Sequence, residues 1–127
     1  KSMIRDLSLD YPDFLIASSE WFAFVPAKEY FDEPGDHADE LETSVMMHYH
    51  PELVNLDEAG NGDYKKFTSQ MLNEKVAWIP RNWQKVSQDT GIGNPKKASA
   101  GKGKKYAEAV VAKYALLFEE LVHKELY

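Results

Sequence analysis

The feature that most constrains this fold is a helical pattern of large apolar residues near the C-terminus. Between Ser99 and Leu126 such residues recur at spacings of four, four, three and four, namely at Tyr106, Val110, Tyr114, Leu117 and Leu121. An α-helix places these positions on one face. The pattern therefore predicts a long amphipathic helix over the last segment of the chain.

Two apolar runs near the N-terminus, Phe14–Ala17 and Trp21–Val25, lack a polar face. Such runs are typical of strands covered on both sides, as in a parallel sheet flanked by helices. A third run, Ala77–Pro80, predicts a short edge strand, since proline is tolerated there. With the helices, this order of elements predicts an α/β layered fold.

Two further helices are expected from stop and cap signals. An amphipathic segment over Met3–Leu9 is followed by Tyr11-Pro12, which should end a helix. A second helix is expected from about Ala38 to Tyr49, with Asp36 as its N-cap. Loops are expected around this helix, at Tyr30–Asp36 and Trp83–Asn94.

Composition excludes several classes of protein. The 127 residues suit one domain or part of one, and the net charge of −6 argues against nonspecific binding to nucleic acid. The apolar runs are far shorter than the roughly 20 residues that cross a bilayer. The absence of cysteine excludes disulfides and thiolate metal sites and fits a cytoplasmic protein.

Charged clusters give one functional hypothesis from the residues alone. His37 follows a Pro-Gly loop at the expected start of a helix, among the acidic residues Asp36, Asp39, Glu40 and Glu42. Ligands bind at such places in open α/β sheets, and an imidazole beside a carboxylate can shuttle protons. The alternative is that the acids only cap the helix and His37 is an exposed loop residue.

Two other groups are better interpreted as solvated. His48 and His50 are two residues apart, which places them on different faces of a helix and does not form a zinc-protease pair. The lysine cluster suggests an anion or nucleic-acid site, but no aromatic residues are interleaved with it. Its members are Lys96, Lys97, Lys102, Lys104 and Lys105.

Two segments of the chain resemble motifs of the creatininase family. The run from His37 to Ser44, His-Ala-Asp-Glu-Leu-Glu-Thr-Ser, is similar to the family's His-Ala-Gly-Glu-x-Glu-Thr-Ser segment. The run Thr-Gly-Ile-Gly-Asn-Pro at 90–95, with the small residues after it, is similar to the family's Gly-x-x-Gly-Asp-Pro pattern. The resemblance implies that residues 1–127 form a single, partial domain, the C-terminal part of a three-layer α/β/α creatininase-like fold.

The activity that this resemblance implies is metal-dependent hydrolysis of a C–N bond in a cyclic amide or formamide. Family members use two divalent metals, zinc or manganese, which activate water and polarise the amide carbonyl. A small-molecule amide is therefore the expected substrate, with no nucleic-acid or membrane partner. The family commonly assembles as hexamers, so a homo-oligomer is expected.

The resemblance also implies roles for single residues. His37 matches the family histidine at the substrate, a proton shuttle to the leaving nitrogen. Glu42 matches the glutamate of Glu-Thr-Ser and is expected to position the loop or the histidine. Asp36 and Asp39 are expected at the substrate, and Asp39 stands where the family usually has glycine, which narrows or charges the pocket. Asn94 replaces the family's usual aspartate.

The family's metal-binding runs, Glu-x-His-Gly and Asn-Gly-His-Gly-Asn, do not occur in these 127 residues. No metal ligand is therefore assigned, and this chain alone is expected to be inactive, with the site completed by an N-terminal segment. One alternative is a non-catalytic assembly or binding module that keeps the same scaffold. A nucleic-acid binder rests only on the lysine cluster.

Overall fold

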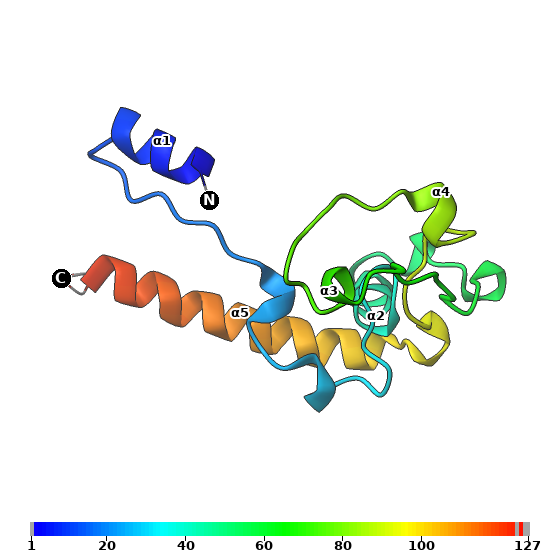
Figure 1. The fold of residues 1–127 in the computed structure, drawn as a ribbon. Coiled ribbons are helices and arrows are strands. Elements are labelled where there is room, and N and C mark those ends of the chain that lie inside the picture. The colour runs from blue at the N-terminus through cyan, green and yellow to red at the C-terminus, as the bar shows by residue number, and fades with distance from the viewer. Residues whose placement is uncertain (1, 124, 126–127) are drawn as a thin grey trace.

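The computed structural model describes residues 2–123 and 125, and two crossing helices dominate it. Helix α2 (Glu40–Tyr49) packs against the N-terminal half of α5 (Ala100–His123) (Figure 1). The other described α-helices are α1 (Ser2–Asp10), α3 (Gln70–Asn73) and α4 (Trp83–Val86). Short 3-10 helical turns cover Trp21–Ala23, Ala27–Glu29, Pro51–Leu53, Leu56–Glu58 and Pro95–Lys97.

The apolar face of α5 is confirmed and forms half of the core. Tyr106 and Val110 are buried, with 0% and 6% of their surfaces exposed. The Tyr106 hydroxyl donates to the carbonyl of Phe22 at 2.8 Å, so its polar end is satisfied inside the core. The helix begins at Ala100, one residue after the predicted start, and the predicted end at Leu126 lies outside the described residues.

Helices α2 and α5 approach closely because Gly103 has no side chain at the crossing. A Cβ built on Gly103 would lie 1.9 Å from the carbonyl oxygen of Ser44, far inside van der Waals contact. The fully buried hydroxyl of Ser44 in turn accepts a hydrogen bond from the Ser99 amide at 3.1 Å. Ser44 of the first motif therefore holds the segment that leads into α5.

The predicted second helix is confirmed, but its cap is one turn later than expected. The prediction of Asp36 as N-cap is wrong, because the helix begins only after Asp39, whose side chain accepts from the Glu42 amide at 2.9 Å. The helix ends at Tyr49, before the predicted His50-Pro51 stop. The first helix also ends, as predicted, before Tyr11-Pro12.

The predicted strands are wrong, and the α/β class is not confirmed for this chain. Within residues 2–123 and 125 there is no strand, only two isolated β-bridges. Phe14–Ala17 is irregular, Trp21–Ala23 is a 3-10 turn, and Ala77–Pro80 is irregular as well. An apolar run forms a strand only where another backbone offers hydrogen bonds. Here the aromatic rings pack on α5 instead.

The contact between the 21–25 segment and α5 is aromatic. The ring of Phe24 lies 4.3 Å from that of Tyr114, and Trp21 meets Tyr106 edge-on at 6.1 Å. Ser19 and Tyr114 also share a hydrogen bond at 2.7 Å between their hydroxyls. These contacts explain why apolar residues with a strand-like pattern lie alongside a helix.

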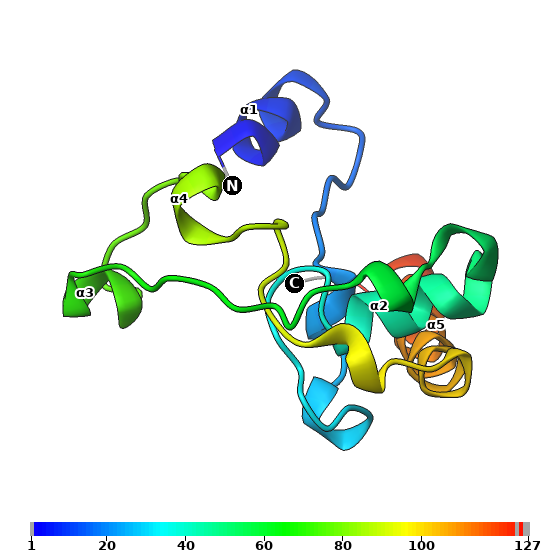
Figure 2. The same ribbon diagram turned by 90° about the vertical axis from the view of Figure 1, so that its right-hand side faces the viewer.

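Two parts of the chain stand away from the helical pair. The N-terminal arm, residues 2–18, carries α1 clear of the other helices (Figure 2). The segment 64–87, called the outer loop below, carries α3 and α4 away from the helical pair. No described helix has the length and apolar composition needed to span a membrane.

Candidate functional site

The two motifs that are far apart in the sequence meet in the structure. His37 and Ile92 form an antiparallel bridge, in which the His37 amide donates to the Ile92 carbonyl at 3.0 Å and the Ile92 amide donates back at 2.8 Å. The Gly93 amide donates to Gly62 at 3.2 Å, which adds a third segment. Gly62 has a φ of +71°, and a Cβ there would lie 1.8 Å from the Gly93 oxygen, so only glycine fits this junction.

His37 lies at the edge of this junction with about half of its side chain exposed. Its Nδ1 is 3.7 Å from Oε2 of Glu42, which is electrostatic contact but longer than a hydrogen bond. Its ring centroid is 5.1 Å from that of Trp83, in a tilted contact. The imidazole is therefore positioned from two sides and open on the others.

Glu42 and Asp39 form a reciprocal cap around the backbone next to His37. The Glu42 carboxylate accepts from the Ala38 amide at 2.7 Å, while Asp39 accepts from the Glu42 amide at 2.9 Å and from Gly35 at 2.5 Å. Ala38 has a φ of +48°, a left-handed conformation that costs a non-glycine residue about 1 kcal/mol or more. The two carboxylates thus hold a strained turn directly after His37.

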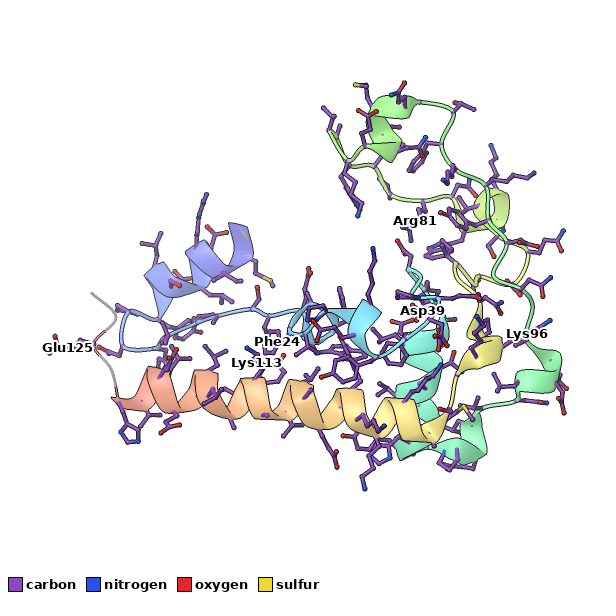
Figure 3. All side chains as sticks on the ribbon, turned by 90° about the horizontal axis from the view of Figure 1, so that it is seen from below. Phe24, Asp39, Arg81, Lys96, Lys113 and Glu125 are labelled. Atoms are coloured by element: carbon purple, nitrogen blue, oxygen red, sulfur yellow. The ribbon has the colours of Figure 1, made fainter. Side chains whose placement is uncertain are left out.

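Asp36 is committed to an ion pair. Arg81 donates two hydrogen bonds to its carboxylate, at 2.5 and 2.6 Å, and the Arg81 guanidinium also lies 5.5 Å from the ring centroid of Trp83. Figure 3 shows Arg81 reaching from the outer loop toward the segment that carries Asp39. Hydrogen bonding to Arg81 holds the pKa of Asp36 below its usual range. Arg81 thereby fixes the outer loop to the residue before His37.

An ion pair between the buried Glu40 of the first motif and Lys102 of α5 was not predicted from the sequence. Glu40 is fully buried, with Oε1 at 2.5 Å from the Lys102 Nζ and Oε2 accepting from the Glu33 amide at 2.6 Å. Lys102 also contacts Asp32 at 2.9 Å, and these two carboxylates raise its pKa. The pair ties the start of α2 to the first turn of α5. Its partners lie far apart in the sequence, so spacing alone could not reveal it.

Most of the lysine cluster is neutralised by neighbouring acids. Besides Lys102, Lys97 contacts Glu33 at 2.7 Å, and Lys104 lies 3.9 Å from Glu108 one helical turn further along α5. Hydrogen bonding to Glu33 raises the pKa of Lys97. These lysines therefore form ion pairs within α5 and with the loop that precedes α2.

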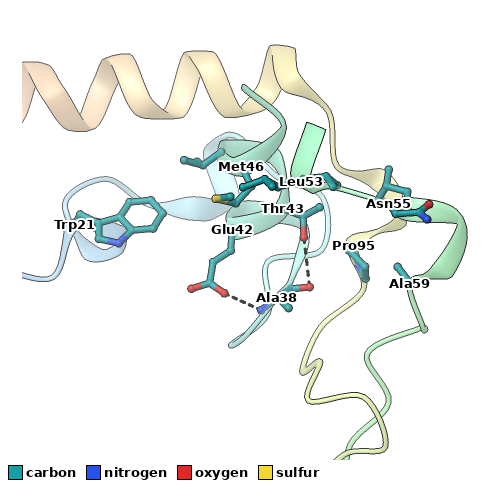
Figure 4. A pocket seen from close by; sticks show the side chains of 12 residues that line it. Trp21, Ala38, Glu42, Thr43, Met46, Leu53, Asn55, Ala59 and Pro95 are labelled. Carbon is teal, nitrogen blue, oxygen red and sulfur yellow. Dashed lines mark hydrogen bonds between the residues drawn. The ribbon is translucent and has the colours of Figure 1, made fainter. Parts of the chain in front are cut away.

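Two pockets flank the junction. The first, of about 470 Å³, lies between α2, the 53–59 segment and Pro95 (Figure 4), with walls that include Trp21, Met46 and Leu53 and a rim at Ala38 and Glu42. The second, of about 760 Å³, lies between the outer loop and the junction and includes Asp36, Arg81, Trp83 and Ile92 in its lining. The His37 segment therefore separates an apolar pocket from a polar one.

The described residues contain no group of three or more His, Cys, Asp or Glu side chains that is placed to hold a metal. His50 contacts only Glu52 among the acids, at 3.2 Å, and both are exposed. The described residues therefore do not form a metal centre by themselves.

The structure brings together His37, Glu42, Asp36 and Asp39, the four residues singled out in the sequence. Their contacts place Glu42 and Asp39 on the backbone and Asp36 on Arg81, and their predicted roles toward a substrate remain predictions. Sequence reasoning missed Arg81 and Trp83, which lie in a segment with no motif. Only the charge of Arg81 after a proline hinted at a polar contact.

Comparisons with known proteins agree with the motifs. The family described as creatininase (creatinine amidohydrolase) matches residues 1–118. The solved structure of a presumed creatinine amidohydrolase from Bacteroides fragilis is 59% identical and superposes with a TM-score of 0.93, over 100% of this chain and 51% of that one. The chain thus spans about half the length of this relative. Curated protein sequences give no significant match.

Proposed function

Because the chain belongs to the creatininase family, we propose that it forms the proton-transfer part of an amidohydrolase acting on a cyclic amide or formamide. The observation that carries the proposal is the bridge between His37 and Ile92, which joins the two family motifs around one exposed imidazole. The similarity to a protein described as a creatinine amidohydrolase supports the same reaction class.

The role of His37 follows from the chemistry of amide cleavage. When water adds to the carbonyl carbon and the C–N bond breaks, the leaving nitrogen needs a proton. An imidazolium can supply it near neutral pH, and positioned acid catalysis of this kind contributes about 10²- to 10⁴-fold in rate. The neighbours of His37 line both pockets, and about half of its own side chain is exposed, which suits contact with a bound amide.

Glu42 and Asp39 act through the backbone in this proposal. Their hydrogen bonds to Ala38, Gly35 and the first turn of α2 hold the left-handed turn that orients His37. Glu42 is therefore a positioning residue. Its Oε2 also lies 3.7 Å from the His37 Nδ1.

The proposal assigns the metal ligands to a part of the protein other than the described residues. Since these residues do not form a metal centre, we assign the expected zinc or manganese site to the region that the Bacteroides fragilis relative has beyond the match. No step of the proposed proton transfer depends on this assignment.

The test joins this chain to the unmatched part of the Bacteroides fragilis relative and measures metal content and creatinine hydrolysis. We expect about two metals per chain and hydrolysis in the chimaera, and neither in the 127-residue chain. In the chimaera, His37→Asn should lower kcat about 100-fold or more while leaving metal content unchanged.

His50→Asn is the matched control, because His50 is exposed and distant from the motif junction in its contacts. Full activity of the His37→Asn chimaera would contradict the proton-transfer role. A chimaera that binds metal but hydrolyses neither creatinine nor a formamide would contradict the amidohydrolase proposal itself.

A further inference from the structure

The larger pocket borders His37 on the side away from α2. Asp36 and Ile92, which line it, are the neighbours of His37 in sequence and in the β-bridge. Trp83 lines it as well, and its ring centroid lies 5.1 Å from that of His37. A molecule held in this pocket would therefore lie beside three residues that adjoin His37, the proposed proton donor.

The lining of this pocket carries an excess of positive charge. Its four cations, Lys65, Lys66, Lys75 and Arg81, face one carboxylate, that of Asp36. Arg81 is already matched by Asp36. Among the described residues the three lysines form no ion pair, whereas Lys97 and Lys102 do. The net charge of the chain is −6, so this local excess is not a property of the whole surface.

One of these lysines, Lys75, acts electrostatically on Asp36, the residue before His37. The charge of Lys75 contributes to lowering the pKa of Asp36, so it lies within electrostatic reach of that carboxylate. With Asp36 bound to Arg81 on both oxygens, the Lys75 charge is left for another anion.

Four aromatic side chains lie among the remaining residues that line the pocket. They are Tyr64, Phe67, Trp78 and Trp83. Trp78 has 83% of its surface exposed, so its face is available to a ligand. Aromatic faces of this kind stack on planar rings.

The pocket is held in place at two points. Tyr64 and Ser87 form a β-bridge, and the Lys65 amide donates to the Val86 carbonyl at 2.8 Å, which closes the neck of the outer loop. Arg81 attaches the far part of the loop to Asp36. The cations and rings are therefore carried on a segment whose position relative to His37 is fixed.

We propose that this pocket binds the substrate through a planar ring bearing a carboxylate, with the ring against Trp78 and the anion among Lys65, Lys66 and Lys75. The inference rests on the proposed function, since it names the substrate class of the same site. A neutral ring such as creatinine would use only the aromatic part of the pocket.

The test measures binding to the 127-residue chain by isothermal titration calorimetry, with orotate and uracil as probes. These compounds share a planar cyclic amide ring, and only orotate carries a carboxylate. Orotate should bind about tenfold tighter than uracil, and the difference should shrink as salt is raised. The triple substitution Lys65→Met, Lys66→Met and Lys75→Met should abolish this preference without affecting uracil.

The matched control is Lys28→Met, Lys105→Met and Lys113→Met. These lysines are also exposed and form no ion pair within the described residues, so the control removes the same net charge elsewhere. It should change orotate binding less than twofold. Trp78→Leu should weaken both probes about fivefold or more. Equal effects of the two lysine triples, or no preference for orotate, would overturn the inference.

The outcome is separable from that of the proposed function. Binding is read at equilibrium on this chain and requires no hydrolysis. A preference for orotate with an inactive chimaera would leave the pocket assigned and the amidohydrolase activity rejected. Activity of the chimaera on creatinine without any preference for orotate would support the amidohydrolase proposal and reject the assignment of the pocket.

Discussion

At the scale of single residues, the surroundings of His37 come from three separate segments of the chain, which contribute Glu42, Arg81 with Trp83, and Ile92. The positions of His37 and Glu42 in one motif predicted their proximity, and the structure confirms it with 3.7 Å between Nδ1 and Oε2. The partner of Asp36, Arg81, is 45 residues away, and no periodicity connects the two. Asp36 was expected to be the N-cap of α2, yet Asp39 takes that position. Local patterns predicted neighbours along the chain, whereas tertiary contacts decided their roles.

The ion pair between Asp36 and Arg81 gives a residue-scale prediction. Arg81→Gln should raise the pKa of Asp36 toward the ordinary value of an aspartate, because the largest contribution to its lowering is the hydrogen bond from Arg81. The pKa can be followed by carbon NMR of the carboxyl group. Arg5→Gln, an exposed change on α1, is the control and should leave this pKa unchanged.

The same pair predicts a sign for the pH dependence of stability. A carboxyl group whose pKa is lowered by folding stabilises the native state above about pH 4, and this contribution is lost as the pH falls through the lowered pKa. Since both side chains are about a third or more exposed, the effect is about 0.5–1 kcal/mol. Urea denaturation of Arg81→Gln should show this loss at pH 7 and not at pH 2. A loss of equal size at both pH values would contradict it.

At the scale of elements, helices were predictable and strands were not. The spacing from Tyr106 to Leu121 and the Tyr11-Pro12 stop depend on the chain nearby, so both ends of α1 and the start of α5 were predicted to within one residue. The runs Phe14–Ala17 and Trp21–Val25 have the composition of strands, but a strand also requires a partner. Within the described residues none is offered, and the apolar side chains remain exposed or pack on α5.

The crossing of α2 and α5 provides the element-scale prediction. Gly103→Ala should lower the free energy of unfolding by about 2–3 kcal/mol, because its Cβ would overlap the Ser44 carbonyl and separate the helices. Gly101→Ala is the matched change one position from the helix start. No atom lies within 4 Å of its Cβ, so it should raise stability by about 0.5–1 kcal/mol. Denaturant titrations of the two variants measure both effects, and equal shifts would reject the packing argument.

At the scale of the whole molecule, large apolar side chains on the N-terminal arm and on the second half of α5 remain exposed. Met3, Leu9 and Phe14 on the N-terminal arm have 70%, 81% and 68% of their surfaces exposed, and Phe118 and Val122 on α5 have 59% and 74%. Large exposed apolar patches mark interaction surfaces. The solved relative has nearly as much chain again beyond the match, and we propose that its counterpart covers these residues.

The prediction at this scale concerns the isolated chain. It should bind the dye ANS and self-associate in size-exclusion chromatography, because apolar surface remains in contact with water. Phe14→Ser with Leu15→Ser should reduce both signals while changing stability by less than about 0.5 kcal/mol. Val25→Ser, at a buried position, should instead lower stability by about 2 kcal/mol. A monomeric chain that binds no ANS would contradict this prediction.

The β-bridge between Tyr64 and Ser87 bears on how ligand preference can differ among members of the creatininase family. Because the two ends of the loop meet in a bridge, the residues between them can be exchanged for others of different length at little cost to the helices. We therefore expect that the segment between Tyr64 and Ser87 can be exchanged as one piece. Transplanting it between relatives should transfer ligand preference as a unit, while His37, the proposed proton donor, stays with the recipient chain.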